Sequence, residues 1–387
     1  MQCKPFLWCL LVIGVFVVGA QGQTAQYVLS NDDMAFPFLT GVGVFSVGAN
    51  GVPSFQQQVQ TGTYGAGGGY FGMSRAAVLD DSSQQCVFAS EARNGLIVGV
   101  MVSTLTAGPG ASGSSTDSGS TNGIGLAMNS NYLYASFSSS NTIGTFQVQS
   151  GCSVSFISDV PVLGILSGAI NGMAIHGNML IATYTDGSIE SFDIANGVPV
   201  SNGDLQLSTA TAASQGATYA NGIDITSDGH YAIFGDTSTS LSIEVSDISS
   251  GRLTKTKVYK SNAAISSSDI LLSPDETILY VINTQGATVS ALFFDKTTGR
   301  LSPGCTSPRM TGLSQSWSYL GSAALINQSG NGGGVYVAEF GSASGVGMVN
   351  LSVSGQKCSL KEAAGSPVLD PNTPGLLSIV SFPPRSF

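Results

Sequence analysis

The chain has 387 residues, with 23 acidic and 13 basic side chains and a formal net charge of −10 at pH 7. This charge would repel a polyanion, so the composition argues against nucleic acid as a partner. Charged residues make up only 9% of the chain and hydrophobic residues 42%. Disorder requires low hydrophobicity and high charge, so a disordered protein is excluded. The 50 glycines favour many short strands joined by turns, and no stretch has the pattern of a long amphipathic helix.

The first 22 residues have the layout of a secretory leader. Lys4 supplies a positive start, an apolar run extends from Phe6 to Ala20, and Ala20 and Gly22 are the small residues expected before a cut at Gln23. The run is shorter than the roughly 20 residues of a membrane-spanning helix, although a retained anchor is the alternative. We therefore expect residues 1–22 to be a signal peptide and residues 23–387 to form one domain without a membrane span. The mature protein is expected to be secreted or periplasmic.

Four cysteines remain once the leader is removed, namely Cys86, Cys152, Cys305 and Cys358. An even number in an exported chain permits two disulfides, but four cysteines allow three connectivities and the sequence selects none of them. Four buried free thiols are an equal alternative. The spacings are too wide for a zinc knuckle, so neither a metal nor a cofactor is expected.

A structural unit recurs at intervals of about 50 residues, a period typical of propeller blades. Each copy starts with a mostly apolar segment, and these segments are residues 76–81, 123–128, 172–177, 222–227, 269–274 and 322–327. A polar turn and two further apolar strands follow each start. A weaker fourth strand follows turn pairs such as Asn196-Gly197 and Thr298-Gly299, which suit tight antiparallel connections. The repeat therefore predicts blades of four antiparallel strands.

The two ends of the chain complete one further blade. Residues 27–32 and 41–47 have the pattern of a second and a third strand with no first strand before them, and residues 375–382 supply the missing strand. Pairing these ends would close the ring and leave no unpaired edge. The sequence thus predicts an all-β, seven-bladed β-propeller closed by its C-terminal strand, in preference to an open β-solenoid or two sandwiches. The low-complexity stretch 107–122 is expected to be a surface loop.

A ligand site is expected at one mouth of the central channel, where the first strand of each blade begins and the second strand ends. Amides, carboxylates and aromatic rings there suit a polar ligand. The expected ligand-binding residues are Asn122, Asn171, Asn221, Asp236, Asp269, Trp317 and Tyr319. A structural alternative exists for the Asn-Gly pairs, which also suit the turns between blades. A calcium ion held by these amides and carboxylates is a weaker alternative, because no compact calcium-loop motif is present.

Four charged residues are candidates for catalysis. Glu91 and Glu339 end the second strands of their blades, and Arg75 and Arg93 belong to the same blade as Glu91. The carboxylates could transfer protons while an arginine orients an anionic or carbonyl group. Alternatively, all four are solvated rim charges with weak ion pairing. His176 and His230 are expected in turns on the opposite face, where they would not act as bases.

Several segments resemble the seven-bladed lactonase-like propellers, the family of 6-phosphogluconolactonase and carboxymuconate-cyclizing enzymes. They are residues 226–231 (TSDGHY), 273–281 (SPDETILYV), 294–301 (FDKTTGRL) and 365–367 (GSP). The resemblance extends over nearly the whole mature chain and implies the fold. It also implies a His that enters the first strand and a Glu that leaves the second. Only Glu91 and Glu339 match that pattern, and no His occupies the entering positions.

Two classes of function follow from these observations. The missing histidine favours a non-catalytic propeller that binds a small polar ligand or an extracytoplasmic protein at the mouth. The propeller is expected to be a monomer. The alternative is a divergent lactone hydrolase or cycloisomerase that uses the carboxylates and arginines of the mouth.

Overall fold

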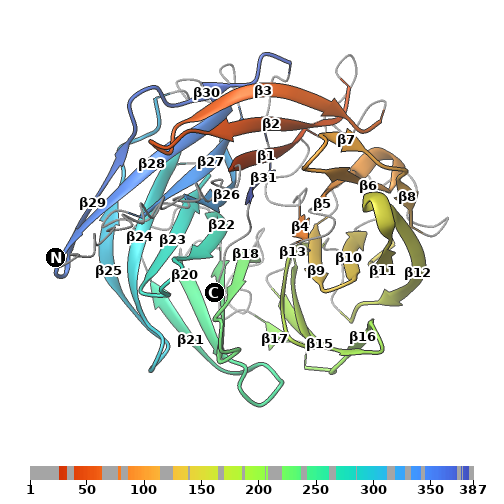
Figure 1. The fold of residues 1–387 in the computed structure, drawn as a ribbon. Coiled ribbons are helices and arrows are strands. Elements are labelled where there is room, and N and C mark those ends of the chain that lie inside the picture. The colour runs from red at the N-terminus through yellow and green to blue at the C-terminus, as the bar shows by residue number, and fades with distance from the viewer. Residues whose placement is uncertain are drawn as a thin grey trace, which may run out of the picture.

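The computed structural model describes the chain in segments, namely residues 26–32, 39–62, 77–79, 86–113, 125–137, 140–163, 170–184, 188–204, 206–207, 220–236, 242–260, 267–284, 286–311, 319–326, 333–340, 345–372, 376 and 378–382. These residues form seven antiparallel sheets arranged around a common centre (Figure 1), which confirms the predicted seven-bladed propeller. Within the described segments, no helix is long and apolar enough to cross a membrane. The predicted leader, residues 1–22, lies outside them.

The first four blades are built from the N-terminal half of the chain and the C-terminal strand. Blade 1 contains β31 (Ser378–Phe382), β1 (Tyr27–Asp32), β2 (Gly41–Val47) and β3 (Pro53–Gln60). Blade 2 contains β4 (Ala77–Leu79), β5 (Cys86–Glu91), β6 (Leu96–Met101), β7 (Thr106–Ala107) and β8 (Ala111–Ser112), with the 3-10 helix η1 (Ala92–Asn94). Blade 3 contains β9 (Leu126–Asn129), β10 (Tyr132–Phe137), β11 (Thr142–Val148) and β12 (Val154–Pro161), with the 3-10 helix η2 (Ser150–Cys152). Blade 4 contains β13 (Ile170–His176), β14 (Met179–Tyr184), β15 (Ser188–Ala195), β16 (Val198–Ser201) and β17 (Gln206–Leu207).

The last three blades follow the same order from the centre outward. Blade 5 contains β18 (Ala220–Ile225), β19 (Tyr231–Asp236), β20 (Ser242–Asp247) and β21 (Thr254–Lys260). Blade 6 contains β22 (Ser267–Leu272), β23 (Ile278–Asn283), β24 (Thr288–Asp295) and β25 (Arg300–Thr306). Blade 7 contains β26 (Tyr319–Leu325), β27 (Gly334–Phe340), β28 (Gly345–Ser354), β29 (Lys357–Glu362) and β30 (Val368–Leu369).

The C-terminal strand closes the ring, as predicted. β31 pairs antiparallel with β1 from Tyr27 opposite Phe382 to Asn31 opposite Ser378. It is the innermost strand of blade 1 and lies beside the N-terminal strands in Figure 1. This pairing satisfies the backbone groups of β1 that would otherwise form an open edge.

The start of the low-complexity stretch is more ordered than the expected loop. β7 and β8 both pair with β6 and together provide the outer edge of blade 2. Residues 114–122 of the stretch lie outside the described segments.

Apolar side chains fill the seams between neighbouring blades. In β27, Val335 and Val337 belong to a cluster with blade 6, whereas Tyr336 and Ala338 belong to a cluster with blade 1. This division follows from the period of two along a strand, which sends successive side chains to opposite faces of the sheet. Each side chain of a second strand therefore packs either against the preceding blade or against the following blade.

Two disulfides join neighbouring blades. Cys86 in blade 2 is bonded to Cys152 in blade 3, and Cys305 in blade 6 is bonded to Cys358 in blade 7. The alternative of four free thiols is therefore wrong, and the connectivity that the sequence left open is settled by which cysteines face each other across a seam.

Candidate functional site

The second strands of all seven blades end at the same face of the propeller, which is the mouth. The residues at these ends are Asp32, Glu91, Phe137, Tyr184, Asp236, Asn283 and Glu339. Successive side chains of a strand point to opposite faces of the sheet, so residues at equivalent positions point toward the same neighbouring blade. The side chains that are described all point toward the preceding blade, namely those of Asp32, Glu91, Phe137, Tyr184 and Glu339. The acidic side chains among them therefore lie in seams between blades.

Glu91 lies in the seam between blades 1 and 2. Its side chain is buried, and Oε1 accepts a hydrogen bond from Thr40 Oγ1 of blade 1 at 3.0 Å. The carboxylate packs against Gly62, where a side chain would collide with it. Oε2 has no hydrogen-bond partner among the described residues. Glu91 is thus held by the neighbouring blade and is not presented to solvent.

Glu339 lies in the seam between blades 6 and 7 and is more isolated. The residue is 0% exposed, and neither carboxyl oxygen has a hydrogen-bond partner in the described part of the chain. Gly347 leaves room for the carboxyl group, which also lies near the terminal methyl group of Met310. Burial, with a smaller contribution from the negative charge of Glu362, raises the pKa of Glu339 to about 8. Glu339 therefore carries a proton at neutral pH.

The two candidate glutamates do not form a pair. Glu91 faces blade 1 and Glu339 faces blade 6, so they point into different seams that are separated by blades 7 and 1. Arg93 lies in η1 and is exposed. No ion pair joins Arg93 to Glu91 among the described contacts. The catalytic role of these residues stays a prediction, and their geometry does not bring them to one point.

Asp269 links the innermost strands of two blades. It is buried in β22, where Oδ2 accepts a hydrogen bond from the backbone N–H of Ala323 in blade 7 at 3.0 Å and Oδ1 accepts one from Ile270 N–H at 2.9 Å. Asp224 makes the equivalent link from blade 5 to Leu272 N–H in blade 6, at 2.7 Å. Both acidic residues stand among the apolar residues of a first strand, and this pattern is a sequence signal for a link between blades. The predicted ligand-binding role of Asp269 remains untested.

Removing this link should destabilise the ring. Asp269→Ala leaves two buried backbone N–H groups without their acceptor, and we expect the free energy of unfolding to fall by about 3 kcal/mol. Urea denaturation would measure the change. Asp295→Ala is the control, because Asp295 also accepts hydrogen bonds, from Thr297 N–H and Thr298 Oγ1, but in an exposed hairpin turn. Equal urea midpoints for the two variants would show that the Asp269 link contributes nothing to stability.

A pair of carboxyl groups in the seam between blades 7 and 1 was missed by sequence reasoning. Asp32 Oδ2 and Asp370 Oδ2 lie 3.3 and 2.9 Å from the point where a Cβ of Gly43 would stand. Burial and the charge of Asp370 raise the pKa of Asp32 well above its usual range, and burial raises the pKa of Asp370. Ser30 Oγ and Gln58 Nε2 donate hydrogen bonds to Asp32. Asp32 ends a second strand as Glu91 and Glu339 do, and this position could have identified it.

Comparison with known proteins assigns the family. A sequence model described as "Lactonase, 7-bladed beta-propeller" matches residues 171–368, from the first strand of blade 4 to the last strand of blade 7. The chain belongs to this lactonase family. The family match agrees with the resemblance found in the sequence, and it covers the blades in which the TSDGHY and SPDETILYV segments lie.

Solved structures share the fold of this lactonase-family propeller at low sequence identity. A protein of unknown function from Desulfotomaculum acetoxidans is 15% identical with a TM-score of 0.62, and the match covers 91% of this chain and 98% of that one. A protein from Bacteroides fragilis, provisionally described as a 6-phosphogluconolactonase, is 14% identical with a TM-score of 0.68, over 94% of this chain and 99% of that one. No curated protein sequence matches the chain. These likenesses establish the architecture, not the reaction.

The two histidines of this lactonase-family chain lie away from the mouth. His176 ends β13 and packs against Gly229 of the next blade, and His230 lies in the turn between β18 and β19. His230 is exposed, with Nδ1 3.8 Å from a carboxylate oxygen of Asp228. Both positions are at the ends of strands opposite the mouth, as predicted. Neither histidine can serve a ligand bound there.

The remaining predicted site residues are described in part or not at all. Arg75, Asn122 and Trp317 lie outside the described residues. The backbones of Asn171, Asn221, Asp236 and Tyr319 lie in β13, β18, β19 and β26, at the mouth ends of these strands, and their side chains are not described. Gly222 has a φ of 59° and lies directly against the backbone of Asp269 in the next blade. The Gly of this Asn-Gly pair is thus required by the packing of the blades.

Proposed function

We propose that this lactonase-family propeller acts outside the cytoplasm and binds a small polar ligand, of the sugar lactone or sugar acid class, at its mouth without converting it. The observation that carries the proposal is the burial of the mouth carboxylates. Asp32 and Glu339 are 0% exposed, and Glu91 and Asp269 are 1% exposed. A ligand in the channel does not meet these oxygens, so its contacts come from amide and aromatic side chains, which bind polar rings without transferring protons.

The location is supported by the two disulfides and by the leader pattern of the first 22 residues. Disulfides form and persist in oxidising compartments and are rare in the cytosol. A sugar phosphate of the cytoplasm is therefore an unsuitable ligand for this acidic, exported chain.

The test combines a binding and a hydrolysis measurement on the purified, oxidised protein. Isothermal titration with D-galactono-1,4-lactone and with gluconate should give saturable binding to at least one of them. A pH-stat assay should show lactone hydrolysis no faster than in buffer. Asn171→Ala and Asn221→Ala are expected to weaken binding about 2- to 10-fold by removing a hydrogen bond, whereas Asn350→Ala on the exposed part of β28 is the control. Absence of saturable binding, or equal affinities in all variants, would contradict the proposal.

A second candidate function is supported by one specific observation. Glu339 keeps its proton at neutral pH because burial raises its pKa to about 8, and a protonated carboxyl group can serve as a general acid for a departing alkoxide. Lactone hydrolysis above the buffer rate that is lost in Glu339→Gln and kept in Glu91→Gln would replace the binding proposal with this one.

A further inference from the structure

A tyrosine recurs at one position in three blades, and in two of them its hydroxyl group is satisfied by the next blade. Tyr134, Tyr280 and Tyr336 each pair with the fourth residue of their third strand. The Tyr134 hydroxyl donates a hydrogen bond to the carbonyl oxygen of Gly197 at 2.9 Å, and that of Tyr336 to Gly51 at 2.7 Å. Gly197 and Gly51 lie in the turns between the third and fourth strands of the blades that follow. These two contacts define the usual role of this tyrosine, which is to seal a seam.

Tyr280 of blade 6 lacks this contact. Its hydroxyl group makes no hydrogen bond with any described residue, although the corresponding turn of blade 7 lies nearby at Gly355. β28 and β29 stay paired as far as Ser354 and Lys357, so the hairpin of blade 7 is paired to its tip. In blade 4 the hairpin is also paired to its tip, at Ala195 and Val198, and the Gly197 carbonyl still accepts the Tyr134 hydroxyl. The difference in blade 7 is that β28 continues from Asn350, its last pair with β27, to Ser354, whereas β15 continues from Asp193, its last pair with β14, only to Ala195.

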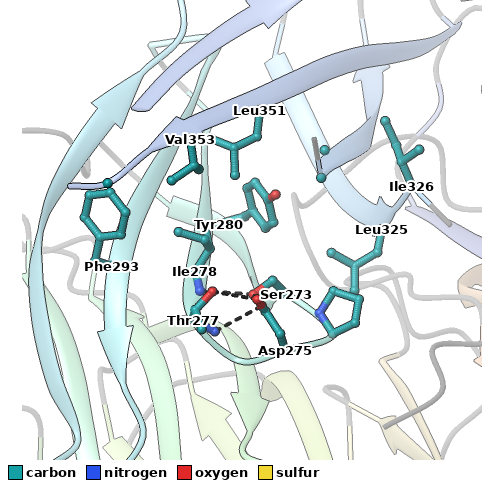
Figure 2. Close-up of a pocket in the computed structure, with 14 residues that line it drawn as sticks. Ser273, Asp275, Thr277, Ile278, Tyr280, Phe293, Leu325, Ile326, Leu351 and Val353 are labelled. Carbon is teal, nitrogen blue, oxygen red and sulfur yellow. Dashed lines mark hydrogen bonds between the residues drawn. The ribbon is translucent and has the colours of Figure 1, made fainter. Parts of the chain in front are cut away.

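A cavity of about 530 Å³ occupies the space where the seam is not sealed (Figure 2). It opens between blades 6 and 7, beside the turn from Ser273 to Thr277, which is at the ends of the strands opposite the mouth. The volume is within the range of small-molecule sites, roughly 300–1,000 Å³. Because it opens at the face opposite the mouth, this cavity is separate from the ligand site proposed at the mouth.

The lining of the cavity is mostly apolar and favours a ligand whose surface is mostly apolar. Figure 2 shows the Tyr280 ring surrounded by apolar side chains from both blades, among them Ile278, Phe293, Leu325, Leu351 and Val353. The Tyr280 hydroxyl is a donor that has no acceptor among the described residues of this apolar lining. A ligand oxygen in the cavity could accept a hydrogen bond from this hydroxyl, and the bond would fix the orientation of the ligand.

The charge at the edge of the cavity disfavours anionic ligands. Asp275 accepts hydrogen bonds from Ser273 Oγ at 2.6 Å and from Thr277 Oγ1 at 2.9 Å. Burial acts to raise the pKa of Asp275, but these hydrogen bonds outweigh it and the pKa is lowered, so the group is ionised at neutral pH. Burial and this negative charge both raise the pKa of Tyr280, which therefore remains a neutral donor. An anionic ligand would meet the negative charge of Asp275 at the edge of the cavity.

We propose that this cavity between blades 6 and 7 is a second binding site, which takes an uncharged, mainly apolar molecule through a hydrogen bond from the Tyr280 hydroxyl to a carbonyl or ether oxygen. Aromatic ketones, esters and lactones have this chemistry. The site does not depend on the ligand proposed for the mouth, because no residue is shared between the two.

The test uses coumarin, a neutral bicyclic lactone, as the probe of the full-length mature protein. A saturation-transfer NMR titration should give saturable binding. Tyr280→Phe should weaken coumarin binding about 3- to 10-fold, as expected for one lost hydrogen bond. Val353→Trp should abolish it, because Val353 lines the rim and is 39% exposed, so a larger ring can fill the cavity without disturbing the core. Tyr336→Phe, which removes the same hydroxyl group from a sealed seam, should leave the affinity unchanged.

A charged analogue of coumarin tests the effect of the negative charge of Asp275. Coumarin-3-carboxylate, which has the same rings with an added negative charge, should bind at least about 10-fold more weakly than coumarin, and Asp275→Asn should reduce this difference. Thermal melting of each variant checks that it is folded. Absence of saturable coumarin binding would overturn the proposal, and so would equal affinities in Tyr280→Phe, Val353→Trp and the unmodified protein.

Discussion

Replacing Glu339 by Gln is expected to flatten the pH dependence of unfolding between about pH 4.5 and 8. Glu339 has a pKa of about 8 in the folded protein, compared with its usual value of 4.5. In this window the folded chain binds a proton that the unfolded chain has released, so the free energy of unfolding decreases as the pH rises. Integrated over the window, the loss is on the order of 5 kcal/mol. The contribution is fully present below the unfolded pKa and is gone above the folded one.

The difference between the unmodified protein and Glu339→Gln gives the contribution of Glu339 to the pH dependence, because all other titrating groups are the same in both. Urea denaturation at pH 5, 6, 7 and 8 should show that the unmodified protein loses more stability than Glu339→Gln over the same range. Glu362→Gln is the matched control. It removes the neighbouring charge that helps to raise the pKa of Glu339, so the slope should persist but end at a lower pH. Parallel profiles for the unmodified protein and Glu339→Gln would mean that Glu339 is already ionised in the folded state.

Removing either disulfide is expected to lower the free energy of unfolding by about 4 kcal/mol through the larger entropy of the unfolded chain. The loops that the two bonds close are similar in length, with sequence separations of 66 and 53 residues. Their surroundings differ. Cys86 and Cys152 are fully buried in the apolar cluster between blades 2 and 3, whereas Cys305 and Cys358 are only partly buried. Cys86→Ala/Cys152→Ala should therefore cost more than Cys305→Ala/Cys358→Ala, because it also leaves a cavity.

Thermal melting of the two double variants, with the oxidised protein as reference, measures both effects. A reductant should break the Cys305–Cys358 bond first, since its sulfur atoms are nearer to solvent. Mass spectrometry after thiol alkylation would follow the order. Melting temperatures that are unchanged in both variants would show that the packing of the seams holds the ring together without the disulfides.

The fold was predictable because it rests on a local pattern that is repeated. The second strands, such as 132–137 and 278–283, have alternating or continuous apolar residues followed by Gly- or Asn-containing turns, and each blade repeats this order. First strands were placed less well. The expected segment 123–128 became β9 at Leu126–Asn129, and 322–327 became β26 at Tyr319–Leu325. Strand ends depend on pairing with a neighbour, and bulges such as the one between Leu320 and Ala323 shift them.

The strand positions of the candidate residues were predicted, but the directions of their side chains were not, and their role in a site stays a prediction. The sequence places Glu91 and Glu339 at the ends of second strands, and in the structure Glu91 ends β5 and Glu339 directly precedes Phe340, the last residue of β27. It does not indicate that their side chains lie between blades, because the seam that a residue enters depends on strand parity and on the blade beside it. Asp370 illustrates the same limit, since it follows β30 and meets Asp32 only because the two ends of the chain share one seam.

The sequence by itself therefore determined the number of blades, the closure of the ring by residues 378–382 and the family. Hydrophobic periodicity and turn residues are local properties of the chain, and each blade repeats them, so they can be recognised without the structure. Only the tertiary structure decided the pairing of the cysteines, the burial of the mouth carboxylates and the cavity beside Tyr280. These depend on distances between residues of different blades, and such distances arise from the packing of whole sheets. The same tyrosine seals a seam in blades 3 and 7 but borders a cavity in blade 6, because the hairpin of the following blade extends further in blade 7 than in blade 4.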